Sequence, residues 1–411
     1  MYYLGIDFGT SGARAAVIDA AGEAVVEVRC RYDTELSLTD SWRTALWQLL
    51  GQLPQPVRRQ TEAIAIDGTS GTVLLCDRNN QPVAPPLLYS DASSSEAEIA
   101  PADSPARSAT SSLAKLLWWR QALPSETLKQ VQGLMHQADW LASLLHGHLG
   151  ISDYNNALKL GYDAAAQAYP GWLSSQDFAP WLPRVVAPGT PLGPVVPQIA
   201  RQFDLPGRCL VKAGTTDSTA AFLATGANQL GDAVTSLGST MVLKIVSPGP
   251  VNDAASGIYS HRLQQTWLAG GASNTGGAVL SHYFSNRELT QLSQQIDPQR
   301  PSHLDYYPLI SPGERFPIND PALSPRLSPV PKSRAHFLHG LLESMARIEA
   351  QGYQQLTASG SGPPRKIYTV GGGAQNPAWQ TIRQRILGLP MASPQYTEAA
   401  YGTARLAAGL T

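Results

Sequence analysis

The segment LGIDFGTSGARAAVIDAAGEAV, residues 4–25, decides the fold of this chain. A β-rich run leads into a bend of Gly, Thr and Ser, and a second β-rich run ends in another turn at residues 19–22. Glycine-rich bends between two such runs are typical of a β-hairpin. We therefore expect a hairpin that is followed by a second turn.

Two later segments resemble this one. They are AIAIDGTSGTVLLCDRNNQPV, residues 63–83, and AVTSLGSTMVLKIVS, residues 233–247, and both place Gly with Ser or Thr at the same bend. Chance does not readily produce three such segments in one chain. The sequence therefore predicts three related hairpins.

Strands that lead through glycine-rich turns into helices indicate an α/β protein. Residues 209–212 lead through Gly214 to a helix that begins at Asp217, and residues 366–370 lead through three glycines to a helix that carries Trp379. Further helices are expected at residues 111–123, 138–145, 335–350 and 398–410. A chain of 411 residues is long enough for two or three domains. We place a domain boundary just after the helix that begins at Asp217.

Composition excludes several classes of protein. A net charge of −1 without a basic block argues against nucleic acid or an anionic membrane as the main partner. The 3 cysteines are too few and too dispersed for a disulfide framework or a metal site. Residues 1–4 run directly into a strand without a signal peptide, and the longest uncharged stretch, residues 263–286, is too polar to span a bilayer. We expect a cytoplasmic protein.

The first and third bends have the chemistry of phosphate loops. In residues 9–12 the glycines allow close backbone approach, and hydroxyl and N–H groups can donate to phosphate oxygens. Residues 238–240 offer a second bend of this kind, and two such bends can grip a triphosphate. Asp7, at the end of the first strand, is placed to bind Mg²⁺ or a substrate hydroxyl, or else it caps its own turn.

Two other positions are candidates for a ligand site. Asp217 follows a glycine-rich strand exit, where ligands of α/β proteins gather, and its carboxylate can accept a proton from a hydroxyl. The alternative is that Asp217 is only the N-cap of its helix. Gly371–Gly373 leave room for a flat ring, and Trp379 either stacks on that ring or packs in the core. The sequence has no P-loop, no GxGxxG after a strand, no HExxH and no GxSxG.

As an ordered set, these motifs resemble the FGGY family of carbohydrate kinases. DFGTSG, GTTDS and VGGGAQNPAW follow one another, and the resemblance runs from Leu4 to EAAYGTARLAAG near the C-terminus. It implies an α/β protein of two actin-like (ribonuclease H-like) domains, each a mixed β-sheet flanked by helices, with the active-site cleft between them. The N-terminal sugar-binding domain would cover residues 1–224, completed by the C-terminal helix at 394–411, and the ATP-binding domain would cover residues 225–393.

The resemblance also implies roles for the residues at matching positions. Those that match the ATP-binding loops are Gly9, Thr10, Ser11, Gly12, Arg14, Gly238, Ser239 and Thr240, and those that match the adenine site are Gly372, Gly373, Asn376 and Trp379. Asp217 matches the catalytic base, which also binds the sugar, and Asp7 matches the carboxylate near the substrate. Both would hold Mg²⁺, directly or through water. Ser70 and Gly71 match sugar contacts.

The implied reaction is transfer of the γ-phosphoryl group of ATP to a primary hydroxyl of a pentulose. The IDGTSGT form looks most like compact ribulokinase-type members, sometimes labelled xylulose kinase-like, so D-ribulose is the expected substrate. Xylulose and polyols such as glycerol are alternatives. One segment departs from the family: aromatic-x-Asp-x-Arg appears as residues 89–93, YSDAS, without Arg. A monomer or homodimer is expected.

A function of another class shares part of this pattern. An ATP-driven clamp of the actin or chaperone type, which binds protein, would have the same two phosphate hairpins. It would not explain Ser70, Gly71 and Asp217 as parts of a small pocket. Stimulation of ADP release by a sugar distinguishes the two.

Overall fold

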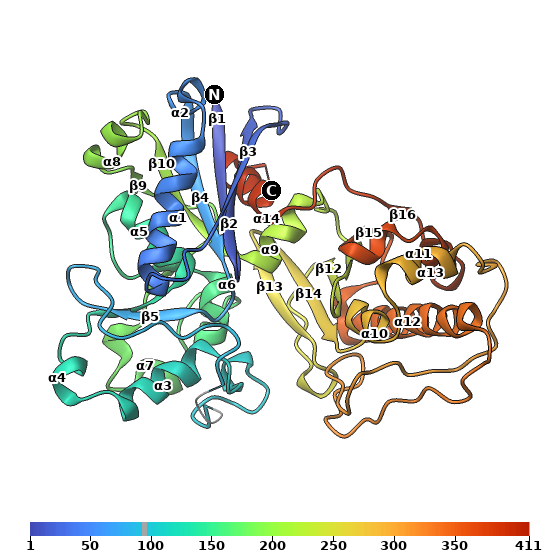
Figure 1. Cartoon of the computed structure of the whole chain (residues 1–411). Coiled ribbons are helices and arrows are strands. Elements are labelled where there is room, and N and C mark those ends of the chain that lie inside the picture. Colours follow the sequence, from blue (N-terminus) through green and yellow to red (C-terminus); the bar gives the residue numbers. More distant parts are fainter. Residues whose placement is uncertain (93–96, 411) are drawn as a thin grey trace. The chain divides into compact units, whose positions relative to one another are not determined.

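The computed structural model describes residues 1–92 and 97–410, which form two compact units (Figure 1). Unit 1 comprises Met1–Gly226 and the C-terminal segment from Tyr396, and unit 2 comprises Ala227–Gln395. Of the YSDAS segment, Ser93 lies outside the described residues. None of the described helices has the length and apolar character that a membrane crossing requires.

Unit 1 is built on a six-stranded mixed sheet in the order β3-β2-β1-β4-β10-β9. Its strands are β1 (Tyr2–Phe8), β2 (Gly12–Asp19), β3 (Ala24–Arg31), β4 (Thr61–Gly68), β9 (Pro191–Pro194) and β10 (Leu210–Thr216). β1, β2 and β3 are antiparallel, which confirms the first hairpin and its second turn, while β1, β4 and β10 are parallel. The central strands are buried on both faces, so their sequences are nearly continuous apolar runs.

Helices cover both faces of this sheet. On one face α1 (Leu38–Gln52) and α5 (Gln137–His146) pack on the large apolar side chains of β1 and β4. On the other, α14 (Ala399–Ala408) lies close to β1 and β4 because their side chains there are small, as at Ala63 and Ala65. α9 (Asp217–Ala224) packs beside α14.

The contact between α9 and α14 depends on Gly402. A Cβ atom at Gly402 would lie 1.8 Å from the carbonyl oxygen of Ala220. We expect Gly402→Ala to lower the free energy of unfolding by about 1–3 kcal/mol, because backbone atoms cannot yield as a side chain can. Gly51→Ala in α1 is the matched control. No described heavy atom lies within 4 Å of the added Cβ there, so this change should stabilise by up to about 1 kcal/mol. Equal effects in urea denaturation would contradict the packing argument.

The region between β4 and β9 forms a smaller layer with its own apolar core around Leu113, Leu116 and Trp119. β5 (Val73–Cys76) pairs with β6 (Gly133–His136), and β7 (Ile151–Asp153) pairs with β8 (Arg184–Val186). The helices of unit 1 not yet named are α2 (Gln55–Arg58), α3 (Ser112–Ala122), α4 (Ser125–Leu128), α6 (Tyr154–Ala157), α7 (Gly171–Ser174) and α8 (Pro197–Gln202).

The second predicted hairpin is wrong. β4 has β1 and β10 on its two edges, so neither edge is open to the run that follows it. The chain turns at residues 69–72 and leaves the sheet, and β5 pairs with β6 in the smaller layer. The repeated segment therefore marks a turn and not a hairpin.

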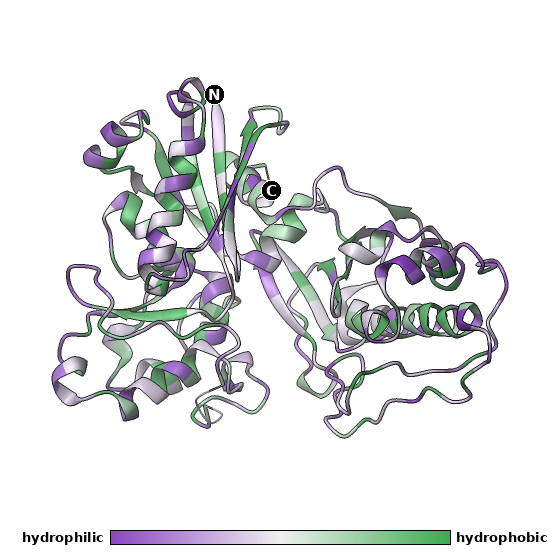
Figure 2. Ribbon diagram, in the orientation of Figure 1, coloured by the Kyte–Doolittle hydropathy of each residue, from purple (hydrophilic) through white to green (hydrophobic). Residues whose placement is uncertain are grey.

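The sheet of unit 2 has the order β13-β14-β12-β11-β15-β16. Its strands β14-β12-β11-β15-β16 repeat the pattern of β3-β2-β1-β4-β10 in unit 1. Its strands are β11 (Asp232–Leu237), β12 (Met241–Ser247), β13 (Tyr259–Leu263), β14 (Thr266–Ser273), β15 (Lys366–Val370) and β16 (Met391–Ala392). Its helices are α10 (Gly277–Tyr283), α11 (Asn286–Ser293), α12 (Arg334–Leu356) and α13 (Pro377–Leu387). β11 and β12 form the third predicted hairpin, which is confirmed. Figure 2 shows hydrophobic residues along α12, which packs on the sheet.

The expectation of an α/β chain with two mixed sheets flanked by helices is confirmed. The predicted helices appear as α3, α5, α12 and α14, and α12 continues beyond Ala350 to Leu356.

Candidate active site

Three aspartates meet at one edge of the sheet in unit 1. Asp7 of β1 is in register with Asp67 of β4, and Asp67 is in register with Thr215 of β10. Asp217 follows two residues later, as the first residue of α9. The carboxyl ends of parallel strands lie at the same end of a sheet. The structure therefore brings Asp7 and Asp217 together at that end, and Asp67 lies on β4, the strand between β1 and β10.

The side chains of Asp7 and Asp67 lie close enough that each shifts the pKa of the other. Asp67 is fully buried, and burial together with the charge of Asp7 raises its pKa well above the ordinary value. Thr403 of α14 donates to Oδ2 of Asp67, whereas Oδ1 is buried without a hydrogen-bond partner among the described residues.

The carboxyl of Asp7 lies in a low-dielectric setting with charges of both signs. Burial raises the pKa of Asp7, the neighbouring side chain of Asp67 lowers it, and the charge of Asp217 raises it. Asp217 follows the end of β10, at the same end of the sheet as Asp7, and its charge therefore acts on Asp7.

Asp217 itself is the first helical residue and not the cap. The N-cap of α9 is Thr216, so the alternative interpretation of Asp217 as an N-cap is wrong. The backbone N–H of Ser218 donates to Asp217 Oδ1 at 2.6 Å.

Asp7 and Asp217 suit a magnesium ion that is shared with phosphates. Mg²⁺ keeps several waters and takes one or two carboxylates plus substrate phosphate, without a dedicated protein cage. Among the residues the structure describes, no group of three or more His, Cys, Asp or Glu side chains could hold a metal ion. Two carboxylates at the strand ends are the donor set that a phosphate-bridging Mg²⁺ needs.

The first bend, residues 9–12, closes the turn from β1 to β2. The N–H of Gly9 donates to the carbonyl of Gly12 at 3.1 Å, and the side chains of Thr10 and Ser11 are exposed. Arg14 pairs with Glu398, just before α14, and the two side chains are 54% and 47% exposed. The bend thus presents its hydroxyls to solvent.

The loop that carries Ser70 and Gly71 is fixed by its neighbours. Gly71 has a φ of 86°, which favours glycine. The N–H of Thr69 donates to Gln137 Oε1 at 3.1 Å, and the hydroxyls of Thr69 and Thr72 are 2.6 Å apart. Ser70 is half-buried at the tip of this ordered loop.

Unit 2 contains a groove of about 1230 Å³ beside the second bend and the glycine-rich loop. The predicted residues that line it are Gly238, Ser239, Gly372, Gly373, Asn376 and Trp379. Thr240 belongs to the same bend but is not one of the residues that line the groove. The structure therefore brings together the second phosphate bend and the predicted adenine site.

Two of the residues that line the groove, Trp379 and Asn376, are also held by contacts inside unit 2. Trp379 is 1% exposed and packs in the core, and its ring lies 2.6 Å from where Gly373 would carry a Cβ. Asn376 caps α13 by accepting from the N–H of Trp379 at 3.1 Å, and it donates to Ser293 Oγ at 2.9 Å. Of the two options for Trp379, core packing is the one the structure has.

Comparison with known proteins decides the family. The N-terminal domain model of the FGGY family of carbohydrate kinases matches residues 2–224, and the C-terminal domain model matches residues 233–410. The chain belongs to the FGGY family of carbohydrate kinases.

Curated relatives match along nearly the full chain. The xylulose kinase of Streptomyces coelicolor is 27% identical over 441 residues, covering 99% of this chain and 87% of the relative. The xylulose kinase of Escherichia coli is 25% identical, covering 98% and 89%, and the gluconokinase of Bacillus subtilis is 20% identical, covering 97% and 85%. This FGGY protein is therefore a sugar kinase, and the clamp alternative falls away.

Solved structures share its fold. A xyloylose kinase from Brucella ovis superposes with a TM-score of 0.88 at 23% identity, covering 100% of this chain and 91% of that one. Plasmodium falciparum glycerol kinase with ADP gives a TM-score of 0.82 at 16% identity, covering 100% and 89%. The expected two-domain actin-like fold is confirmed.

Sequence reasoning missed two features of this FGGY kinase. Asp67 was not assigned a role, although Asp7 and Asp67 begin the same motif in two repeated segments. The groove is also lined by Gly277, Ser281 and Gln294. The signal was present there too, because GGASNTGG at residues 270–277 leads from a strand through glycines into α10.

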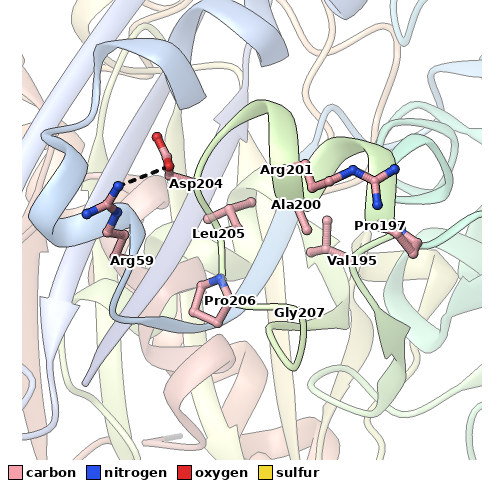
Figure 3. Close-up of a pocket in the computed structure, with 9 residues that line it drawn as sticks. All are labelled: Arg59, Val195, Pro197, Ala200, Arg201, Asp204, Leu205, Pro206 and Gly207. Carbon is pink, nitrogen blue, oxygen red and sulfur yellow. Dashed lines mark hydrogen bonds and ion pairs between the residues drawn. The ribbon is translucent and has the colours of Figure 1, made fainter.

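Unit 1 contains a pocket of its own, of about 600 Å³, between α2 and the turn after α8 (Figure 3). Arg59 and Arg201 flank it, and Arg59 pairs with Asp204 at 3.4 Å. Its lining is Arg59, Val195, Pro197, Ala200, Arg201, Asp204, Leu205, Pro206 and Gly207, and no predicted site residue is among these described residues.

Proposed function

We propose that this kinase transfers the γ-phosphoryl group of ATP to a primary hydroxyl of a five-carbon ketose, with D-ribulose preferred. The observation that carries the proposal is the meeting of Asp7 and Asp217 at the strand ends of unit 1. One carboxylate can accept the hydroxyl proton, and the other can hold the substrate or its metal ion. Family membership supports the reaction class.

In the proposed reaction Asp217 orients the sugar hydroxyl and takes its proton as the phosphoryl group is transferred. The transition state is loose, so positioning and charge neutralisation contribute more than proton abstraction. Ser70 and Gly71 bind the sugar. Asp67 lies buried beside Asp7 and lowers its pKa.

Unit 2 would bind ATP through its groove, with Gly238, Ser239 and Thr240 at the phosphates and the glycine loop at the adenine. Residues 9–12 and Arg14 of unit 1 would hold phosphate oxygens as well. Asp7 and Asp217 would hold Mg²⁺, directly or through water, and the ion would neutralise charge on the phosphates when bound.

D-xylulose is the second candidate substrate. Several curated relatives along nearly the whole chain are named xylulose kinases. D-ribulose and D-xylulose differ in the configuration of one hydroxyl, so the same constellation serves both.

A coupled ADP-release assay across D-ribulose, L-ribulose, D-xylulose, ribitol and glycerol tests the proposal. We expect D-ribulose to give the highest kcat/KM. If D-xylulose does so, the second candidate replaces the first. If no pentulose raises ADP release above the rate without sugar, the proposed function fails.

The groove makes a separate prediction at Gly372. No described heavy atom lies within 4 Å of a Cβ built there, so the side chain of Gly372→Val would project into open space and occupy the groove. We expect the KM for ATP to rise about tenfold or more, equivalent to about 1.4 kcal/mol of binding, with the sugar KM unchanged. Gly249→Val is the control, because its Cβ also meets open space but away from the groove. Equal KM values for ATP in the two variants would argue against nucleotide in this groove.

A further inference from the structure

Lys115 of α3 carries a buried ammonium group beside the Ser70–Gly71 loop. Its side chain is 0% exposed. Nζ donates to the backbone carbonyls of Gly71 at 2.7 Å, Leu88 at 2.6 Å and Thr110 at 3.0 Å. Burying a charge is costly unless every donor has an acceptor, and this ammonium has three of each.

The three acceptors belong to three separate loops. Gly71 is in the proposed sugar loop, Leu88 begins the segment that contains Tyr89 and Asp91, and Thr110 precedes α3. The first two loops also contact each other, because the N–H of Tyr89 donates to Thr72 Oγ1 at 3.0 Å. Leu88 in turn donates its N–H to Asp91 Oδ2 at 2.7 Å. The ammonium of Lys115 thus links the Ser70–Gly71 turn to residues 88–91. These residues belong to the segment that lacks the Arg of the family pattern.

A space-filling role alone would not need this charge. The residues around Lys115 on α3, such as Leu113 and Leu116, fill the apolar core of the smaller layer without polar groups. Nζ instead reaches out of that core to three backbone carbonyls, of which that of Leu88 also accepts from the N–H of Asp91 at 3.0 Å. Gln137 holds the loop from its other side through Thr69.

We propose that Lys115 is a positioning residue of the sugar site, which fixes the Ser70–Gly71 loop against residues 88–91 and thereby sets the affinity for the sugar. The proposal rests on the proposed function, since it takes Ser70 and Gly71 as sugar contacts. It predicts a defect in sugar binding that leaves ATP binding alone.

Lys115→Met tests the proposal, because it keeps the length and removes the donors. We expect the KM for D-ribulose, or for the best pentulose of the panel, to rise about tenfold or more, and the KM for ATP to change by less than about twofold. Lys115→Arg keeps a charged donor and should fall between the wild type and Lys115→Met.

Leu116→Ala is the matched control for loss of stability. It lies next in the same helix, is fully buried, and belongs to the core around α3. Its melting temperature should fall while its sugar KM stays near that of the wild type. If Lys115→Met lowers the melting temperature with an unchanged sugar KM, Lys115 is only structural and the proposal is overturned.

The wild-type protein supplies a readout that does not depend on a folded variant. Burial lowers the pKa of Lys115 to about 8, with the charge of Lys159 lowering it and that of Asp91 raising it. Above this pH the amine has two N–H groups for three carbonyls, so the sugar KM should rise between pH 7 and pH 9 while the ATP KM does not. A flat sugar KM over this range contradicts the proposal. A wild type that phosphorylates no pentulose refutes the proposed function instead.

Discussion

Replacing Asp217 by Ala will lower the turnover of sugar phosphorylation by at least about a hundredfold, the lower end for a lost general base. The carboxylate opens α9 at the edge where β1, β4 and β10 end, and its charge acts on Asp7. The groove that we propose to bind ATP lies in unit 2 and is not lined by Asp217. The dissociation constant for ATP, measured by calorimetry, should therefore stay nearly unchanged.

Asp217→Asn sharpens this prediction, since it keeps the shape and the bond from the Ser218 N–H but removes the base. It should be nearly as inactive as Asp217→Ala. Asp163→Asn is the control, because Asp163 is an exposed carboxylate of unit 1 that accepts from the N–H of Ala165 and Ala166. Near-normal turnover in Asp217→Asn would remove the assignment of Asp217 as base.

Arg383→Met will cost about 3–5 kcal/mol of the stability of unit 2, because it leaves a buried carboxylate without its partner. Arg383 of α13 and Glu349 of α12 are both 0% exposed and form two hydrogen bonds, at 2.6 and 2.7 Å. Thr369 of β15 accepts from Arg383 at 2.9 Å, and Thr235 of β11 donates to Glu349 at 2.5 Å. The pair thus joins both helices to the sheet of unit 2.

Two further variants separate the cause of this loss. Arg383→Met combined with Glu349→Leu removes both charges and should recover much of the stability, since replacing a buried pair by apolar groups is often neutral. Arg326→Met breaks an exposed pair with Asp305 in the same unit, at 2.7 Å, and should cost less than about 1 kcal/mol. If urea denaturation followed by circular dichroism gives equal losses for Arg383→Met and Arg326→Met, the buried network does not stabilise unit 2.

Much of the fold could be predicted from the repeated motif. The second predicted hairpin was wrong, and this has a physical reason. The first and third segments form hairpins because the first strand of each has a free edge on which the second strand pairs, as β2 does on β1 and β12 does on β11. The second does not, because β4 is enclosed by β1 and β10, and sequence periodicity carries no information about which edges are occupied. The helices follow from local pattern and caps, such as Asn376 and Gly388 at the two ends of α13.

The residues of the candidate site that could be predicted are those whose signal lies within a short stretch of sequence. Asp7 and Asp217 stand in recognisable strand exits, and the structure brings them together. Asp67 repeats the pattern of Asp7, but only the register of parallel strands shows that the two meet. Lys115 could not be found, because its acceptors Gly71 and Leu88 lie 44 and 27 residues away in sequence. Trp379 and Asn376 line the groove as expected, but Trp379 also packs in the core and Asn376 also caps α13.

Identification of the product by ³¹P NMR tests the central claim most directly. Wild-type protein incubated with ATP, Mg²⁺ and D-ribulose should convert the γ-phosphate signal into that of a phosphate ester on a primary carbon, in step with ADP formation, and Asp217→Asn should form almost none. Release of inorganic phosphate without a sugar ester, across all the pentuloses tested, would contradict the account.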